Sequence, residues 1–258
     1  MSGVGAVEPV RRGEVHSFSR PALDALIDNE IQAVRLPGFA DQAEVSTLAA
    51  LLLRDSIRTH SVPTVTRLGI SQYEQGVRGS KQHYFAAARA LEHEMAAVFG
   101  CSFSPVARLL DRLRSLGFDA DVMAEPGWGR YWAGTGKLRD GATPIHVDYS
   151  PQDSDGWAVG EVTAQLAWNV YLSCEPADEL VVWDRQWVPQ HDVHQVPGEY
   201  YYDEAVVAGA GELRIPPLVG DVVIINARNY HTVVPCRERL AFGSFIGVTT
   251  PGTLRLWS

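Results

Sequence analysis

The pattern of apolar and polar positions divides the chain into two parts of different character. From residue 21 to residue 117, apolar residues recur mostly at three- and four-residue spacing, as in "FADQAEVSTLAALLLRD" and "SPVARLLDRLRSLG". This spacing predicts amphipathic helices. One short apolar segment of this part, "IQAVRLPGF", predicts a strand. From residue 118 to residue 258 the pattern changes to short apolar segments separated by turn residues, which predict strands.

The arrangement of these predicted strands indicates the fold class. About eight short strands follow one another at nearly regular spacing without intervening helices, which favours an antiparallel jelly roll or barrel over a parallel sheet. The sequence contains no internal repeat and no Gly/Ser-rich linker, so we expect a single domain over residues 21–258 and an N-terminal arm over residues 1–20. The expected fold is α+β, with a mainly-β core supported by the N-terminal helices.

Composition and charge narrow the range of partners. The 258 residues carry a formal net charge of -9, and the sequence pI is about 5.3. This charge argues against nucleic acid and against an anionic membrane surface, so a small molecule or a protein is expected. The three cysteines, Cys101, Cys174 and Cys236, are widely spaced and form no CxxC pair, which is typical of a reducing compartment. With no apolar run of membrane-spanning length, we expect a soluble cytoplasmic protein.

The segment "TPIHVDY" carries the first candidate chemistry. His146 and Asp148 are two positions apart, and residues at this spacing share one face of a strand. His231 follows a second predicted strand, "GDVVIINAR", and completes a set of two histidines and one carboxylate. Such a triad leaves coordination positions open on Fe(II), an arrangement suited to oxygen activation. A second pair, His191 and His194 of "HDVH", lies in a predicted loop and is the weaker metal candidate.

A basic residue after the third candidate ligand supplies a further indication. Arg239 stands eight residues after His231, at the start of the apolar strand "RLAFGSFIG". An inward guanidinium binds a carboxylate through a fork of donors that lysine does not offer. 2-Oxoglutarate chelates Fe(II) through its C1 carboxylate and C2 ketone, and its far C5 carboxylate needs such a fixed cation. Arg237 has the same strand parity and stays open as an alternative anchor.

Four segments together resemble a known family. "RYWAGTGKLRDGATPIHVDY", "NVYL", "ELVVWD" and "GDVVIINARNYHTVVPCRERLAFGSF" are similar to core segments of the Fe(II)- and 2-oxoglutarate-dependent oxygenases, in particular the prolyl-hydroxylase-like branch. The resemblance covers most of the chain and implies a distorted double-stranded β-helix, a cupin-like jelly roll. It implies that His146, Asp148 and His231 hold Fe(II), that Arg239 binds the C5 carboxylate of 2-oxoglutarate, and that O2 is the oxidant.

Further roles follow from the same resemblance. Tyr171 matches a tyrosine that supports the C5 carboxylate, and Tyr131 matches one near the bound co-substrate. Asn169 shares a strand face with Tyr171, where its amide would hydrogen-bond 2-oxoglutarate or iron-bound water. Trp157 and Tyr201 lie in two long segments that we expect to close over the iron, so they are predicted substrate contacts. Four acidic residues of these segments would suit a cationic amine: Asp153, Asp155, Asp203 and Glu204.

Departures from the family pattern refine the expected reaction. The residue pair after Arg239 is Leu240-Ala241, so a hydroxyl that often assists the arginine is absent. The chain is also similar to small-molecule halogenases, which carry glycine or alanine where this chain has Asp148. Because a carboxylate fills the site that a halide needs, we expect hydroxylation of an unactivated C–H bond in an amino-acid derivative or natural-product intermediate, with release of succinate and CO2. Desaturation, ring formation, hydroxylation of a peptide, and a non-catalytic metal- or ligand-binding β-roll are the alternatives.

Overall fold

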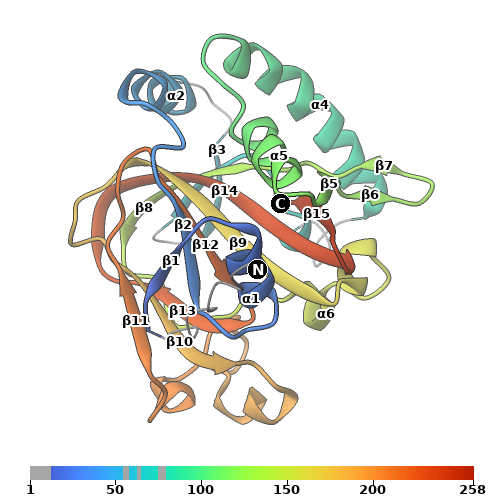
Figure 1. Cartoon of the computed structure of the whole chain (residues 1–258). Helices are drawn as coiled ribbons and strands as arrows, with labels where there is room; N and C mark the ends of the chain where they lie inside the picture. Colours follow the sequence, from blue (N-terminus) through green and yellow to red (C-terminus); the bar gives the residue numbers. More distant parts are fainter. Residues whose placement is uncertain (1–12, 55–57, 63–64, 75–79) are drawn as a thin grey trace, which may run out of the picture.

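Most of the strands belong to one large sheet. The computed structural model describes residues 13–54, 58–62, 65–74 and 80–258. Eight strands of the ten-stranded sheet have the order β1-β2-β12-β9-β14-β8-β4-β3 (Figure 1). The other two form a branch, in which β15 pairs with β14 on one edge and with β5 on the other. Its strands are β1 (Val15–Ser17), β2 (Ala33–Leu36), β3 (Arg58–Val62), β4 (Val65–Leu68), β5 (Asp119–Val122), β8 (Thr135–Gly141), β9 (Ala164–Ser173), β12 (Val222–Asn226), β14 (Cys236–Thr250) and β15 (Thr253–Trp257).

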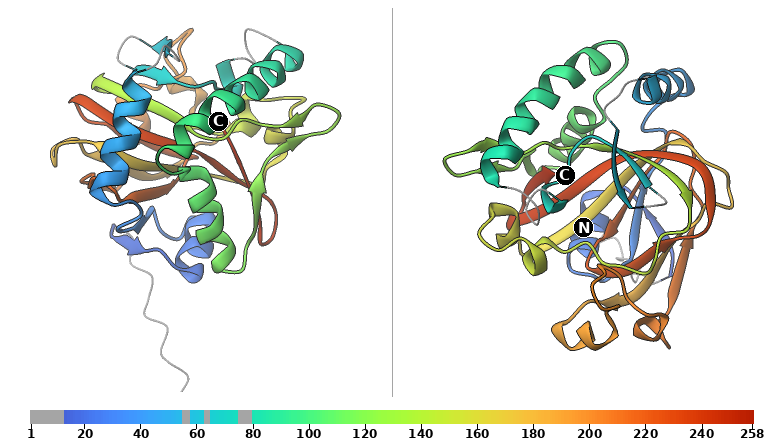
Figure 2. Two further views of the ribbon diagram at one scale, coloured as in Figure 1. Left: turned by 90° about the horizontal axis from the view of Figure 1, so that it is seen from above. Right: turned by 180° about the vertical axis from the view of Figure 1, so that it is seen from behind.

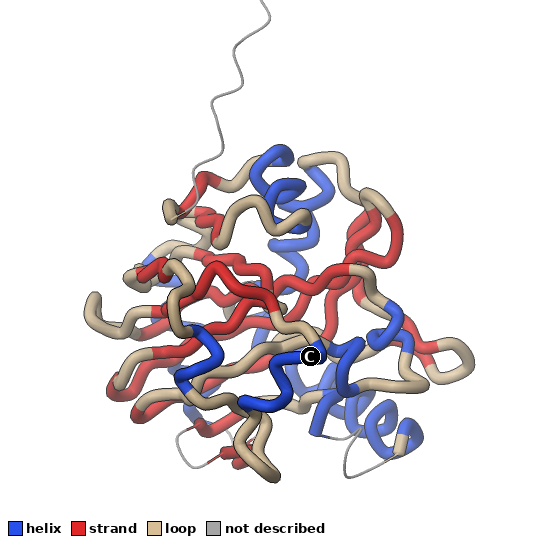
Figure 3. Tube along the Cα trace, turned by 90° about the horizontal axis from the view of Figure 1, so that it is seen from below, coloured by secondary structure: helices blue, strands red, loops and turns tan. Residues whose placement is uncertain are grey.

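Two smaller sheets complete the β-structure. Strands β10 (Leu180–Gln186), β11 (Glu212–Ile215) and β13 (Asn229–Val233) form an antiparallel sheet in the order β11-β10-β13. Strands β6 (Ala124–Glu125) and β7 (Gly129–Arg130) form a short hairpin. Seen from below, the strands occupy the middle of the molecule and the longer helices lie at its periphery (Figure 3).

The four longer helices cover the face of the large sheet that is turned away from the three-stranded sheet (Figures 1 and 2). Helix α5 begins where Ser104 accepts a hydrogen bond from the amide of Ala107, with Pro105 in the first turn. Serine at the cap followed by proline is a favoured helix start. The helices are α1 (Arg20–Ile27), α2 (Gln42–Arg54), α4 (Lys81–Gly100), α5 (Pro105–Ser115) and α6 (Ser150–Asp153), with 3-10 turns η1 (Ala158–Glu161), η2 (Pro189–His194) and η3 (Glu204–Val207).

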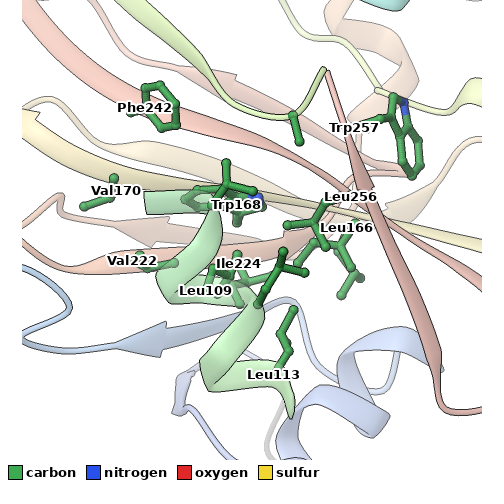
Figure 4. Close-up of a cluster of buried hydrophobic side chains, with 14 of the residues drawn as sticks. Leu109, Leu113, Leu166, Trp168, Val170, Val222, Ile224, Phe242, Leu256 and Trp257 are labelled. Carbon is green, nitrogen blue, oxygen red and sulfur yellow. The ribbon is translucent and has the colours of Figure 1, made fainter. Parts of the chain in front are cut away.

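Alternation along β9 separates the core of the protein into two layers. Leu166, Trp168 and Val170 point outward and pack in the cluster that includes Leu109 and Leu113 of α5 (Figure 4). Ala167 and Tyr171 point inward and pack in a second cluster between the large and the three-stranded sheets. Polar residues on the inward face are therefore enclosed between two sheets and not exposed on a surface.

The structure confirms the coarse fold prediction and corrects the assignment of elements. The protein combines helices with a mainly-β core that contains one large sheet. The strand predicted in "IQAVRLPGF" is β2. Strands β3 and β4 were not predicted: they form a hairpin inside the part expected to be helical, and β4 pairs with β8. Val15–Ser17 of the predicted arm forms β1, parallel to β2. Among the described residues, no helix combines the length and apolar character needed to cross a membrane.

Candidate metal centre and co-substrate site

Two backbone segments bring the predicted triad together. His146 and His231 exchange both backbone hydrogen bonds, at 3.1 and 2.9 Å, although they are far apart in sequence. The amide of Asp148 donates to the carbonyl of Ala227 at 2.9 Å. One ligand atom from each of His146, Asp148 and His231 lies within 4.8 Å of the others, and this is the one such group in the described part of the chain. The three side chains are thus arranged to hold a single ion.

Backbone carbonyls fix the orientation of both imidazoles. The Nδ1 atom of His146 lies 2.8 Å from the carbonyl of Pro144, and that of His231 lies 2.9 Å from the carbonyl of Asn229. Since a carbonyl only accepts, each Nδ1 carries the proton and each Nε2 presents a lone pair. The Nε2 of His231 lies 3.4 Å from Oδ2 of Asp148. A backbone carbonyl that accepts from Nδ1, and so leaves Nε2 free for the metal, is typical of metal-ligating histidines.

The electrostatic setting keeps the three groups ready for a cation. Burial and the neighbouring His231 lower the pKa of His146 to about 3. Burial opposes ionisation of Asp148, but the neighbouring His231 and His146 outweigh this and hold its pKa below the usual range. At neutral pH the site therefore offers a neutral imidazole and a carboxylate, so few protons need to leave when a metal binds.

Arg239 is the inward member of the two candidate arginines. It is 3 % exposed, whereas Arg237 is exposed to solvent. A bulge between Cys236 and Arg239, with Glu238 at a φ of 48°, breaks the regular alternation that the sequence implies. The guanidinium carbon of Arg239 lies 4.9 Å from the centre of the Tyr171 ring. Of the two candidate arginines, Arg239 is thus the one that lies buried beside Tyr171.

Arg239 and Tyr171 present buried polar atoms that lack partners. In the described part of the chain, Nε and Nη1 of Arg239 and the hydroxyl of Tyr171 form no hydrogen bond. Buried donors are normally satisfied, and an unpaired buried cation is costly. A ligand carboxylate between them would accept from both groups. The residues present therefore fit 2-oxoglutarate beside a metal held by the triad.

Two further side chains on the inward face of β9 adjoin the site. Asn169 lies opposite Gly243 of β14, where a Cβ would approach the carbonyl oxygen of Trp168 to 2.0 Å and Oδ1 of Asn169 to 2.6 Å. Glycine at this position thus leaves room for the amide of Asn169. Gln165 accepts a hydrogen bond from the amide of Ser150 at 2.8 Å and so anchors the chain just after the metal motif.

The structure places Tyr131 and Trp157 in contacts that the sequence did not indicate. The hydroxyl of Tyr131 donates to Glu125, and its ring packs against Trp157 with a centroid distance of 6.2 Å. Both side chains belong to an aromatic cluster with Tyr84 and Phe85 of α4. The aromatic contacts of both rings lie within this cluster, and their roles toward co-substrate and substrate stay predictions. These contacts attach α4 and η1 to the rest of the fold.

Tyr200, and not the predicted Tyr201, contacts the triad. The Tyr200 ring lies 5.7 Å from the imidazole of His146 in an edge-to-face arrangement, whereas Tyr201 packs against Tyr200. The backbone of the next residue, Tyr202, donates to the carbonyl of Ile145 at 2.8 Å and fixes this segment beside the metal motif. Three consecutive tyrosines in a long loop indicated that this segment could reach the site. The sequence did not indicate which of the three faces the triad. The alternative pair, His191 and His194, lies on η2 outside the triad.

The four acidic residues expected to suit an amine take different positions. Asp203 accepts from the amide of Ala205 and caps η3, and Glu204 and Asp155 are exposed. Asp153 is exposed as well, but partial desolvation and then the nearby Asp148 raise its pKa to about 6, so it is the member most strongly coupled to the triad. Only this one carboxylate of the four is positioned to influence the site.

We expect Tyr131→Phe and Tyr171→Phe to have opposite effects. Tyr131→Phe removes a donor to the buried Glu125 carboxylate, so the free energy of unfolding should fall by about 1–2 kcal/mol, with the affinity for 2-oxoglutarate unchanged. Tyr171→Phe should weaken 2-oxoglutarate binding by about tenfold and leave stability unchanged or raised, because its hydroxyl has no partner in the free protein. Thermal unfolding and calorimetric titration of 2-oxoglutarate measure both. Equal losses of co-substrate affinity would restore Tyr131 to the site.

The fold and the triad with its arginine define a 2-oxoglutarate-dependent non-haem iron oxygenase. A family model described as the carrier-protein-independent halogenase WelO5 matches residues 14–253, so the chain belongs to this family. The leucinostatins biosynthesis cluster protein S of Purpureocillium lilacinum is 32% identical over 201 residues, which are 73% of this chain and 82% of that protein.

Two further comparisons cover nearly the whole chain. L-γ-glutamyl-L-propargylglycine hydroxylase of Streptantibioticus cattleyicolor is 26% identical over 257 residues, 95% of each chain. The crystal structure of an N-substituted L-amino acid dioxygenase from Burkholderia ambifaria superimposes with a TM-score of 0.66 at 16% identity, over 93% of this chain and 91% of that one. This likeness agrees with the coarse fold expected from the sequence, in which helices support a mainly-β core.

Proposed function

We propose that the protein hydroxylates an unactivated C–H bond of a small amino-acid derivative or natural-product intermediate, with 2-oxoglutarate converted to succinate and CO2. The observation that carries this proposal is the complete triad beside the unpaired buried atoms of Arg239 and Tyr171. The hydroxylase from Streptantibioticus cattleyicolor supports an amino-acid derivative as the substrate class. In this proposal the two facing sheets are the layers of a distorted double-stranded β-helix.

Each residue of the site has a defined task in this reaction. His146, Asp148 and His231 would hold Fe(II), a ligand set suited to a metal that also binds co-substrate and oxygen. When bound, iron and 2-oxoglutarate together supply the oxidising power, because decarboxylation of the co-substrate drives the reduction of O2. Arg239 and Tyr171 hold the far carboxylate of the co-substrate, and Asn169 donates to it or to water on the metal.

The inward apolar residues keep bulk water away from the reacting atoms. Ala167, Val182, Val223 and Ile225 are all buried between the two sheets. A dry, enclosed site protects a strong oxidant from side reactions and strengthens the electrostatic contacts that position the substrate. The positioning of one C–H bond toward the metal is therefore the contribution of the protein to selectivity.

Asp148 favours hydroxylation within a family named for a halogenase. Its carboxylate occupies the coordination position that a halide ligand needs, so no site for chloride remains on the ligand side of the metal. The distinguishing experiment supplies Fe(II), 2-oxoglutarate, O2 and a high concentration of chloride with a panel of γ-glutamyl and N-acyl amino acids. We expect a product that has gained one oxygen atom and no chlorine. A chlorinated product from the wild-type protein would identify it as a halogenase instead.

A further inference from the structure

Strand register places three more cations on the face that carries Arg239. In β8, Arg139 pairs with Arg239 and Lys137 pairs with Ala241 of β14. In β4, Arg67 pairs with Lys137. Directly paired residues of antiparallel strands point to the same face. Arg67, Lys137 and Arg139 therefore share the inward face with Arg239 and Tyr171, whereas the intervening Leu138 packs with the outer cluster.

Lys137 and Arg139 lie within electrostatic reach of the triad. Burial, then the neighbouring Arg139, lowers the pKa of Lys137 to about 7, and Asp148 opposes the shift. Burial, then Arg239, lowers the pKa of Arg139 to about 10, again opposed by Asp148. Burial raises the pKa of the Tyr200 hydroxyl, and the positive charge of Arg139 opposes this rise. Tyr200 is the residue that contacts His146. The charges of both cations are thus coupled to the carboxylate of the triad.

Neither cation has an acidic partner. Within the described ranges, the side chains of Lys137 and Arg139 form no ion pair, and the ammonium of Lys137 faces the ring of Phe245 at 5.9 Å. Other partly buried cations are paired, including Lys81 with Glu125 at 2.6 Å and Arg67 with Glu74 at 3.6 Å. Unpaired, half-buried cations of like charge destabilise a free protein, so a ligand anion is the natural counter-charge.

The co-substrate does not supply this counter-charge. Fe(II) and the dianion of 2-oxoglutarate cancel each other, and Asp148 cancels Arg239. Arg139, and Lys137 in its protonated form, then remain without a counter-charge inside a protein whose overall charge is -9. A guanidinium and an ammonium side by side match the two oxygens of one carboxylate.

We propose that Lys137 and Arg139 form the substrate anion site, and that the substrate of this enzyme presents a carboxylate to them with Tyr200 beside it. This inference rests on the proposed function, and it narrows the substrate to acids: amino-acid derivatives with a free carboxylate are accepted, and their amides or esters are rejected. It also corrects the emphasis of the sequence, which pointed to acidic loop residues and a cationic amine. In this proposal, Lys137 and Arg139 make the substrate side of the site basic.

The test measures binding and needs no turnover. Ni(II)-loaded protein saturated with 2-oxoglutarate is titrated with γ-L-glutamyl-L-leucine, N-acetyl-L-leucine and their C-terminal amides, followed by calorimetry and ligand-observed NMR. We expect at least one acid to bind about tenfold or more tightly than its amide. Lys137→Gln and Arg139→Gln should each remove this preference and leave the dissociation constant of 2-oxoglutarate within about twofold of the wild type.

Matched variants separate the possible failures. Arg237→Gln removes an exposed cation of β14 and should change neither binding step. Melting temperatures of the Lys137 and Arg139 variants should equal or exceed that of the wild type, because repulsion between cations is relieved. If no acid binds more tightly than its amide, or if 2-oxoglutarate affinity falls as far as it does in Arg239→Gln, the inference is wrong. If 2-oxoglutarate fails to bind the metal-loaded wild type, the proposed function itself has failed.

Discussion

Replacing Asp148 with alanine is expected to weaken Fe(II) binding by at least about 100-fold and to abolish 2-oxoglutarate turnover. The variant leaves two histidines whose Nε2 lone pairs still converge, but it removes the only anionic ligand of the triad. Without this carboxylate, the half-buried site is neutral or positive through His146, His231 and the surrounding cations. A divalent ion then loses both a coordinate bond and the charge that compensates it.

Metal titration of the apoprotein, with succinate release as the second readout, measures this effect. Asp155→Ala is the matched control, because Asp155 is exposed on the segment after the metal motif. It should bind Fe(II) like the wild type. Fe(II) affinity in Asp148→Ala within about twofold of the wild-type value would show that the metal lies elsewhere.

The second large effect is expected for Arg239→Gln. The dissociation constant of 2-oxoglutarate should rise by about 100-fold, because truncating one partner of a buried charge pair costs about 2–5 kcal/mol. Arg239 is 3 % exposed and has unpaired donors, so its removal should leave the melting temperature of the free protein unchanged or higher. The expected signature is thus a loss of co-substrate affinity without a loss of stability.

Calorimetric titration of the Ni(II)-loaded protein separates this signature from a folding defect. At one fixed concentration of 2-oxoglutarate, the thermal stabilisation seen in the wild type should shrink in Arg239→Gln, since it rises with the logarithm of ligand concentration over dissociation constant. Arg237→Gln, two positions away and exposed, should behave as the wild type. Comparable losses in the two variants would contradict the assignment of Arg239 as the anchor.

Local periodicity predicted the long elements and missed the short ones. The helix over Pro105–Ser115 and the strand over Ala164–Ser173 have apolar residues at regular spacing that also bury them, so pattern and packing agree. Val15–Ser17 is three residues long, too short to display a period, and is defined by its pairing with β2. The hairpin of β3 and β4 extends the sheet from β8, and such pairing depends on residues distant in sequence.

The same distinction explains which site residues the sequence identified. His146, Asp148, His231 and Arg239 have spacings that reflect direct chemical requirements of metal and carboxylate binding. Tyr131 satisfied the same kind of motif, but its hydroxyl donates to Glu125, an acid that no local pattern links to it.

The positions of the remaining site residues depend on strand pairing and on the path of one loop. Tyr200, Lys137 and Arg139 reach the site through a loop register and strand pairing. These relations exist only in three dimensions, so the sequence alone did not mark the three residues as neighbours of the triad.

Anaerobic addition of 2-oxoglutarate to the Fe(II)-loaded wild type tests the central claim most directly. Chelation of Fe(II) by the keto acid gives a weak visible charge-transfer band, which we expect in the wild type and in Arg237→Gln. In Arg239→Gln the band should appear only at about 100-fold higher 2-oxoglutarate, and in Asp148→Ala it should be absent at the same Fe(II) concentration. A wild-type protein that binds Fe(II) but shows no band at any concentration of 2-oxoglutarate would contradict the assignment of this site.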